Sequence, residues 1–149
     1  LSDTSAQRYA GCVEAFENNH MQFDEKTSYH TGRYSYEDGY AGMQAVLQRT
    51  PHVTAVFAMA DVIAIGAIRA LVDAGLRVPE DISIIGYDGL KIGSFYTPKL
   101  STVSQSVEML ARRSFSVLMD CMEHGDARRH LTVPFTLSNR ESVRKISSL

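Results

Sequence analysis

The sequence has 149 residues, 44% of them hydrophobic, which is enough for one globular domain with a sizeable buried core. Its net charge of −2 gives no electrostatic basis for binding nucleic acid or a membrane surface. No apolar run approaches the roughly 18 residues that a membrane-spanning helix requires, so none is expected.

The first half of the chain predicts alternating helices and strands. In chain order these are a helix near 5–19, a strand at 26–31, a helix near 35–48, a strand at 54–58 and a helix at 62–74. The strand at 26–31 is predicted only from its short length and its Thr and Tyr content. Ser35 and Asp38 resemble a capping box at the start of the second helix, and Gly75 is typical of a helix end.

The second half continues this pattern. It predicts a strand at 82–87, a loop with at most one helical turn, a short strand at 100–103, a helix near 106–123 and a last strand at 131–137. Gly125 stops the helix, and Pro134 restricts the last strand to a sheet edge or a crossing segment. Repeated βα units predict an α/β fold in three layers (αβα), with a mostly parallel, doubly wound sheet. Because no strand precedes the first helix, we expect only part of a domain.

Two of the predicted apolar strands end on a carboxylate. Residues 54–60 lead into Asp61, and residues 82–87 lead into Asp88. Polar groups at the carboxyl ends of parallel strands line the crevice in which open α/β sheets bind small ligands. The sequence therefore predicts a ligand-binding crevice at this edge of the sheet.

Several stretches together resemble the ligand-binding core of the LacI/GalR family of bacterial transcription regulators. They are Arg8-Tyr-Ala-Gly11, Tyr36-Glu-Asp-Gly-Tyr40, Thr54-Ala-Val-Phe-Ala-Met-Ala-Asp61, residues 65–88 with Val78-Pro-Glu-Asp81, Tyr96-Thr-Pro-Lys-Leu-Ser-Thr-Val103, Gln105 and Arg140-Glu-Ser142. The long segment at 65–88 is the most specific of them. The resemblance implies the type I periplasmic-binding-protein-like fold, with two subdomains around an effector cleft.

The resemblance also implies how the chain is divided. Residues 1–105 would form the C-terminal subdomain without its first strand, 106–137 would belong to the N-terminal subdomain, and 138–149 would return to the C-terminal one. We therefore expect a piece of a cytoplasmic regulator that forms a homodimer. Operator DNA would be bound only by a helix-turn-helix domain outside this chain. No cofactor and no enzymatic activity are expected.

Arg8 and Asp88 are the main candidates for binding a small-molecule effector. The planar guanidinium of Arg8 offers five donors that suit sugar hydroxyls or a carboxylate, and the carboxylate of Asp88 can accept hydrogen bonds from vicinal hydroxyls. The resemblance implies that both residues contact the effector, which would be a sugar or a sugar derivative. The alternatives are a solvated helix arginine and a carboxylate that caps the following turn.

Four further residues complete the predicted effector site: Thr4, Tyr34, Asp61 and Gln105. Tyr34 can stack on a flat ligand face, and Gln105 can line the floor of the cleft. Surface, linker and helix-capping roles remain open for these residues. Ala60 offers no side-chain hydrogen bond where sugar-binding relatives carry a polar residue, so a less polar effector or a protein partner is an alternative.

Ile65 and Tyr96 are predicted to lie at the dimer interface, with a core role as the alternative for Ile65. The five histidines are scattered without ligand spacing, so no metal site is expected. Cys12 and Cys121 are expected to be free thiols, although a disulfide stays open. Two other functions fit the residues less well: a solute-binding protein of a sugar transporter, and a glycosidase that uses Asp61 and Asp88 as its carboxylate pair.

Overall fold

The computed structural model describes residues 3–28, 30–125 and 131–145. Its elements are α1 (Asp3–Asn18), α2 (Glu25–Ser28), α3 (Tyr36–Arg49), β1 (Ala55–Phe57), α4 (Asp61–Asp73), β2 (Ser83–Asp88), the 3-10 helix η1 (Lys91–Ser94), β3 (Ser101–Gln105), α5 (Val107–His124) and β4 (Phe135–Ser138). The predicted elements are confirmed in type and order, with the exception of the strand at 26–31.

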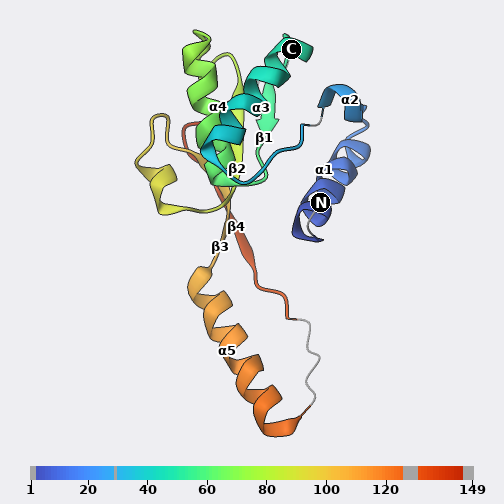
Figure 1. The fold of residues 1–149 in the computed structure, drawn as a ribbon, viewed down its shortest axis with the longest axis vertical. Coiled ribbons are helices and arrows are strands. Elements are labelled where there is room, and N and C mark those ends of the chain that lie inside the picture. Colours follow the sequence, from blue (N-terminus) through green and yellow to red (C-terminus); the bar gives the residue numbers. More distant parts are fainter. Residues whose placement is uncertain (1–2, 29, 126–130, 146–149) are drawn as a thin grey trace.

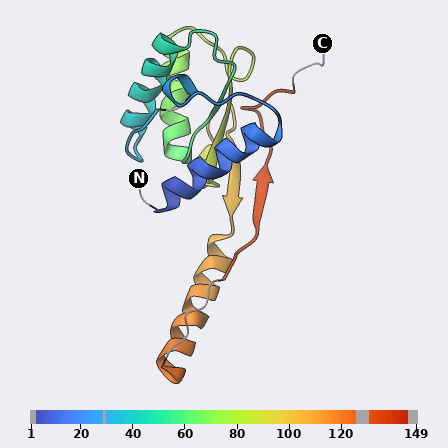
Figure 2. The same ribbon diagram turned by 90° about the vertical axis from the view of Figure 1, so that its right-hand side faces the viewer.

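The four strands form one sheet in the order β1-β2-β3-β4. The first three run parallel, and β4 pairs with β3 in the antiparallel sense (Figure 1). Along β2, Ile84 and Gly86 are buried on the side of α4, whereas Ile85 and Tyr87 face α1. Helices α3 and α4 therefore cover one face of the sheet and α1 covers the other (Figure 2), which confirms the three-layer αβα architecture.

The hydrophobic core lies between α4 and the sheet. Ile68 and Leu71 of α4 pack with Ile84 of β2 and with Leu100, and none of these four side chains is exposed to solvent. Burial of a side chain of this size contributes about 1.5–3 kcal/mol. The core thus fixes α4, and with it the sheet edge at which β1 and β2 end.

Helices α3 and α4 touch through two glycines. A Cβ atom at Gly39 would collide with the carbonyl oxygen of Ile63, and one at Gly66 would collide with the carbonyl oxygen of Tyr36. Glycine is required where two backbones approach this closely. This contact holds the amino end of α3 in place, where Ser35 caps the helix by accepting a hydrogen bond from the Asp38 amide.

The segment around Ser142 joins β2 to β3 near their amino ends. The Ser142 hydroxyl donates to the carbonyl oxygen of Ile84 at 2.6 Å and accepts from the Ser101 amide at 2.8 Å. The Ile84 amide in turn donates to the Ser142 carbonyl oxygen. Because Ser142 is fully buried, these bonds satisfy backbone groups that water cannot reach.

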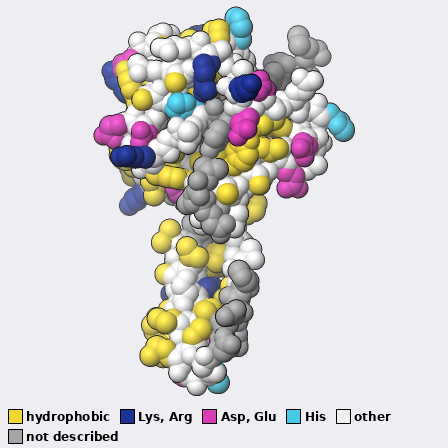
Figure 3. Space-filling model, turned by 45° about the vertical axis from the view of Figure 1, so that its right-hand side comes forward, with side chains coloured by type: hydrophobic (Ala, Val, Ile, Leu, Met, Phe, Trp, Pro, Cys, Tyr) yellow, Lys and Arg dark blue, Asp and Glu magenta, His cyan; other side chains and the backbone are white. Residues whose placement is uncertain are grey.

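Helix α5 projects away from the sheet (Figures 1 and 2) and has no buried side chain. Its apolar residues are instead exposed, with Val107 and Met122 each 72% and Phe115 64% accessible. Hydrophobic side chains are visible along this helix in Figure 3. So much exposed apolar surface is typical of a helix that packs against another structural element.

The predicted strand at 26–31 is wrong where the structure describes it. Residues 25–28 form the short helix α2, and residues 30 and 31 belong to no regular element. Asp24 accounts for the difference, because its carboxylate accepts hydrogen bonds from the Lys26 amide at 3.0 Å and from the Thr27 hydroxyl at 3.2 Å. This local capping outweighs the strand propensity of Thr and Tyr. Tyr29, residues 126–130 and residues 146–149 lie outside the described residues.

Substitution of Gly66 by alanine tests the contact between α3 and α4. The new methyl group would meet the Tyr36 carbonyl oxygen, so the helices must separate, and we expect a loss of roughly 1–3 kcal/mol or more in the free energy of unfolding. Urea denaturation of the full-length protein measures this loss. Gly11→Ala is the matched control, because no atom lies within 4 Å of a Cβ there and helix propensity predicts a gain of up to about 1 kcal/mol. Equal effects at both glycines would contradict the interpretation.

Candidate functional site

Arg8 connects α1 to the carboxyl ends of β1 and β2. Its guanidinium donates to the carbonyl oxygen of Met59, which follows β1, and to the carboxylate of Asp88 at 3.2 Å. The guanidinium carbon also lies 3.9 Å from the ring centroid of Tyr87, in a cation–π arrangement. Only 13% of the Arg8 side chain is exposed. Arg8 is therefore a largely enclosed bridge between a helix and the sheet, rather than a solvated helix arginine.

Asp88 has an unusual backbone conformation at the end of β2. Its φ angle is +116°, in a region of backbone conformation that residues other than glycine rarely adopt. Residues held in such conformations cost about 1–3 kcal/mol each and are concentrated at functional sites. Burial raises the pKa of the Asp88 carboxyl above its usual value; the positive charge of Arg8 opposes this effect, and the negative charge of Asp61 adds to it.

Tyr34 completes a group with Arg8 and Asp88. Its hydroxyl is 2.8 Å from the Ser5 hydroxyl of α1, and the Arg8 guanidinium carbon lies 6.0 Å from its ring centroid. The residue is 46% exposed, so part of its surface is accessible to a ligand. Three residues that were predicted from distant parts of the sequence are thus brought to one end of the sheet.

A groove of about 720 Å³ runs between α1 and the sheet beside Arg8. Its polar lining residues include Thr4, Gln7, Arg8, Tyr87 and Gln105, and its apolar ones include Cys12, Ala15, Phe16, Phe57 and Ile85. Two of the predicted site residues, Thr4 and Gln105, therefore lie on the wall of this groove. A ligand with both hydroxyl groups and an apolar face suits such a lining.

Asp61 is not part of this groove. Its side chain has no exposed surface, and its two oxygens accept hydrogen bonds from the Thr102 hydroxyl at 2.7 Å and from the Leu90 amide at 2.6 Å. Helix α4 begins at Asp61 itself, and its N-cap residue is Ala60. The arrangement leaves Asp61 with no path to a ligand, so the glycosidase alternative loses its second carboxylate.

Sequence reasoning missed Tyr87 and Ser5. Alternation along β2 could have indicated Tyr87, because the side chains of residues 85 and 87 must point to the same face of the sheet. No comparable signal existed for Ser5, whose partner Tyr34 is 29 residues away. That contact depends on the tertiary placement of the segment between α2 and α3.

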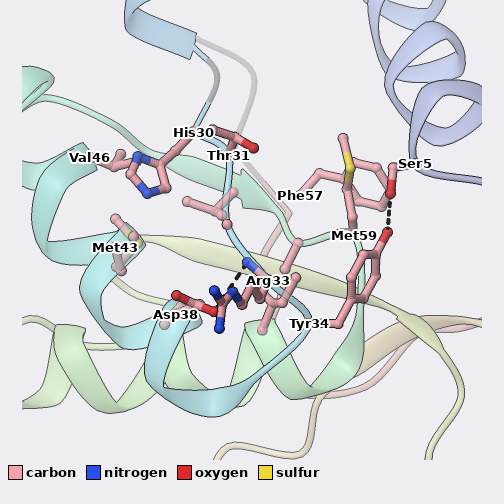
Figure 4. A pocket seen from close by; sticks show the side chains of 17 residues that line it. Ser5, His30, Thr31, Arg33, Tyr34, Asp38, Met43, Val46, Phe57 and Met59 are labelled. Atoms are coloured by element: carbon pink, nitrogen blue, oxygen red, sulfur yellow. Dashed lines mark hydrogen bonds between the residues drawn. The ribbon is translucent and has the colours of Figure 1, made fainter. Parts of the chain in front are cut away.

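A second, smaller cavity of about 140 Å³ lies between the 30–34 segment, α3 and β1. Figure 4 shows the side chains of Met43 and Val46 on one side of it and those of Phe57 and Met59 nearer α1. Tyr34 stands at its edge, hydrogen-bonded to Ser5. Its lining combines apolar side chains with polar ones such as His30, Thr31 and Asp38.

Ile65 and Tyr96, predicted at a dimer interface, lie on a shallow groove of about 450 Å³ together with Tyr40 and Arg69. Ile65 is 7% exposed and belongs to the core cluster, whereas Tyr96 is partly buried and packs against that cluster. Within the described part of the chain, no three His, Cys, Asp or Glu side chains form a group that could hold a metal ion. No helix of that part is long and apolar enough to cross a membrane.

The raised pKa of Asp88 predicts a pH dependence of stability. Because the folded protein binds this proton more tightly than the unfolded chain, stability supplied by protonated Asp88 is lost as pH rises from the usual value of 3.8 through the raised value. We expect wild-type stability to fall relative to Asp88→Asn across this window and then to run parallel to it. Urea denaturation of both proteins at a series of pH values measures the difference. A relative rise with pH would show that the ion pair with Arg8 outweighs burial.

Comparison with known proteins identifies the family of the chain. The model of the periplasmic binding protein-like domain matches residues 2–143. The chain is 36% identical over 145 residues to the HTH-type transcriptional repressor PurR of Mannheimia succiniciproducens, covering 97% of this chain and 43% of the relative. It is 32% identical over 135 residues to the HTH-type transcriptional regulator MalR of Clostridium butyricum, covering 91% and 40%.

Solved structures agree with these relatives. The complex of the transcriptional regulator CelR with cellobiose aligns with a TM-score of 0.86 at 33% identity, covering 92% of this chain and 42% of that one. The chain thus spans less than half the length of each of these proteins. With the family match over nearly its whole length, the chain belongs to the periplasmic binding protein-like domain family, and it is similar to the corresponding part of LacI/GalR-type transcription regulators.

Proposed function

We propose that this chain binds a sugar or sugar derivative as the effector of the regulator to which it belongs. The observation that carries the proposal is the Arg8–Asp88 pair beside the groove, where β1 and β2 end. At this place the guanidinium of Arg8 supplies hydrogen-bond donors and Asp88 supplies a carboxylate. The aromatic rings of Tyr34 and Tyr87 lie beside the guanidinium. Sugars are recognised by this combination of planar hydrogen-bonding groups and aromatic faces.

The hydrogen-bonding capacity of the pair supports a polyhydroxylated ligand. Among the described residues, the buried Nε of Arg8 has no hydrogen-bond partner. Only one oxygen of Asp88 is engaged by Arg8, and the Asp88 side chain is 34% exposed. A diol can therefore donate to the Asp88 carboxylate oxygen that Arg8 does not engage, without displacing the ion pair.

We further propose that residues 106–137 belong to a second subdomain that closes over this groove. The exposed apolar surface of α5 supports this division, because the helix has no covering element among the described residues. Binding of effector between the two subdomains would favour the closed arrangement. In the whole regulator, closure would alter the affinity for operator DNA, with a coupling of typically 1–3 kcal/mol.

Effector binding is tested with the full-length protein. A thermal-shift screen against mono- and disaccharides identifies a ligand, and calorimetry then compares variants. We expect Asp88→Asn and Arg8→Lys each to weaken binding about tenfold or more, because lysine cannot reach Met59 and Asp88 at once. Asp81→Asn is the matched control, since that carboxylate pairs with Arg77 at 2.9 Å outside the groove. Equal affinity of Asp88→Asn and wild type would refute the proposed site.

The proposed homodimer uses the surface groove that contains Tyr96. Tyr96 is the better target for a test, because substitution of Ile65 would disturb the core. Tyr96→Glu is expected to shift the protein toward monomers in sedimentation experiments, since a charge would be buried in an isologous interface. Val72→Glu is the control: Val72 is an exposed residue of α4, the helix that carries Ile65, and it lies outside the groove. If Tyr96→Glu stays fully dimeric, this surface is not the interface.

A further inference from the structure

The carboxylate of Asp61 is fully buried at the start of α4, outside the proposed effector groove. Both of its oxygens act as acceptors, one for the Thr102 hydroxyl and the other for the Leu90 amide. The Thr102 oxygen itself accepts from the Gly89 amide at 3.2 Å. Asp61 and Thr102 thus receive the two backbone N–H groups that directly follow Asp88. Burial of a carboxylate costs free energy unless hydrogen bonds compensate for the water that it loses.

This arrangement determines the path of the chain after Asp88. Gly89 has a φ of +78°, which glycine tolerates, whereas Asp88 at +116° is strained. Such strain persists only where the surroundings hold the backbone from several directions. Two hydrogen bonds to the following amides, together with the β2–β3 pairing of Asp88 with Ser104, provide that restraint.

The packing around Asp61 leaves little room for adjustment. A Cβ at Gly86, two residues before Asp88, would collide with the Asp61 carboxylate, and one at Gly89 would lie 2.6 Å from the Ser104 hydroxyl. The Asp61 carboxylate is therefore packed directly on the backbone of β2. Its position at the start of α4, whose core contacts are extensive, makes it a rigid support.

We propose that Asp61 is a positioning residue for Asp88. It acts through Thr102 and the amides of residues 89 and 90, and it holds Asp88 in the conformation that presents its carboxylate to Arg8. The relevance of this role to ligand binding rests on the proposed effector site. The geometry of Asp88 can be measured without any ligand, so the two proposals fail separately.

The primary test compares Thr102→Val with Thr102→Ser in the full-length protein. Valine keeps the shape but removes the hydroxyl, and serine restores it. Hydrogen–deuterium exchange of the segment 88–92 is expected to accelerate about tenfold or more in Thr102→Val and to remain near wild type in Thr102→Ser. Crystal structures of the two variants should show Asp88 separated from Arg8 in the valine variant only.

Asp61→Asn provides the direct test, because the amide has one acceptor oxygen for two donors. We expect the same loss of protection at 88–92 and the same separation of Asp88 from Arg8. Ser142→Ala is the control for general destabilisation: it removes buried hydrogen bonds at the opposite ends of β2 and β3 and should leave the 88–92 segment protected relative to global unfolding.

Retention of the positive φ and the Arg8 contact of Asp88 in Thr102→Val would overturn the proposal, even if Asp61→Asn fails to fold. The same retention in a folded Asp61→Asn protein would also overturn it. If Asp88 is displaced as expected but no sugar binds the wild-type protein, the positioning role holds and the proposed effector is wrong.

Discussion

The guanidinium of Arg8 is the interaction on which the site depends. It is the point where α1, the end of β1 and the end of β2 meet, through Met59, Asp88 and the ring of Tyr87. A planar group with five donors can serve all three neighbours at once, which an ammonium group cannot. Because the guanidinium is largely enclosed, each of these contacts is stronger than its solvent-exposed equivalent.

The opposite side of the sheet supplies the rigidity that this site needs. Helix α4 contributes the core residues Ile68 and Leu71, and its first residue, Asp61, carries a buried carboxylate beneath the strand ends. The close contact of α3 with α4 at Gly39 and Gly66 fixes the segment that presents Tyr34. The hydrophobic core and the binding residues are thus linked through hydrogen bonds from buried side chains to the backbone at the strand ends.

The two carboxylates at the strand ends have different environments, although their sequence contexts look alike. Asp88 is partly exposed and paired with Arg8, whereas Asp61 is fully buried and satisfied by Thr102 and the Leu90 amide. Their mutual repulsion adds to burial in raising the pKa of Asp88. One acid is therefore available to a ligand while the other supports it.

The sequence alone determined the order of helices and strands from residue 35 onward, the open α/β class and the placement of Asp61 and Asp88 at strand ends, because periodicity, capping residues and strand-end acids are local signals. The expectation that Arg8 and Asp88 share one site came from the family resemblance. Tertiary structure alone decided the helix at residues 25–28, the burial of Asp61 and the roles of Tyr87 and Ser5. Burial and hydrogen-bond partners depend on residues that are distant in the chain: Asp61 meets Thr102 across 41 residues. No local sequence pattern indicates a contact between residues so far apart in the chain. Only the folded structure therefore shows that Asp61 is buried and bonded to Thr102.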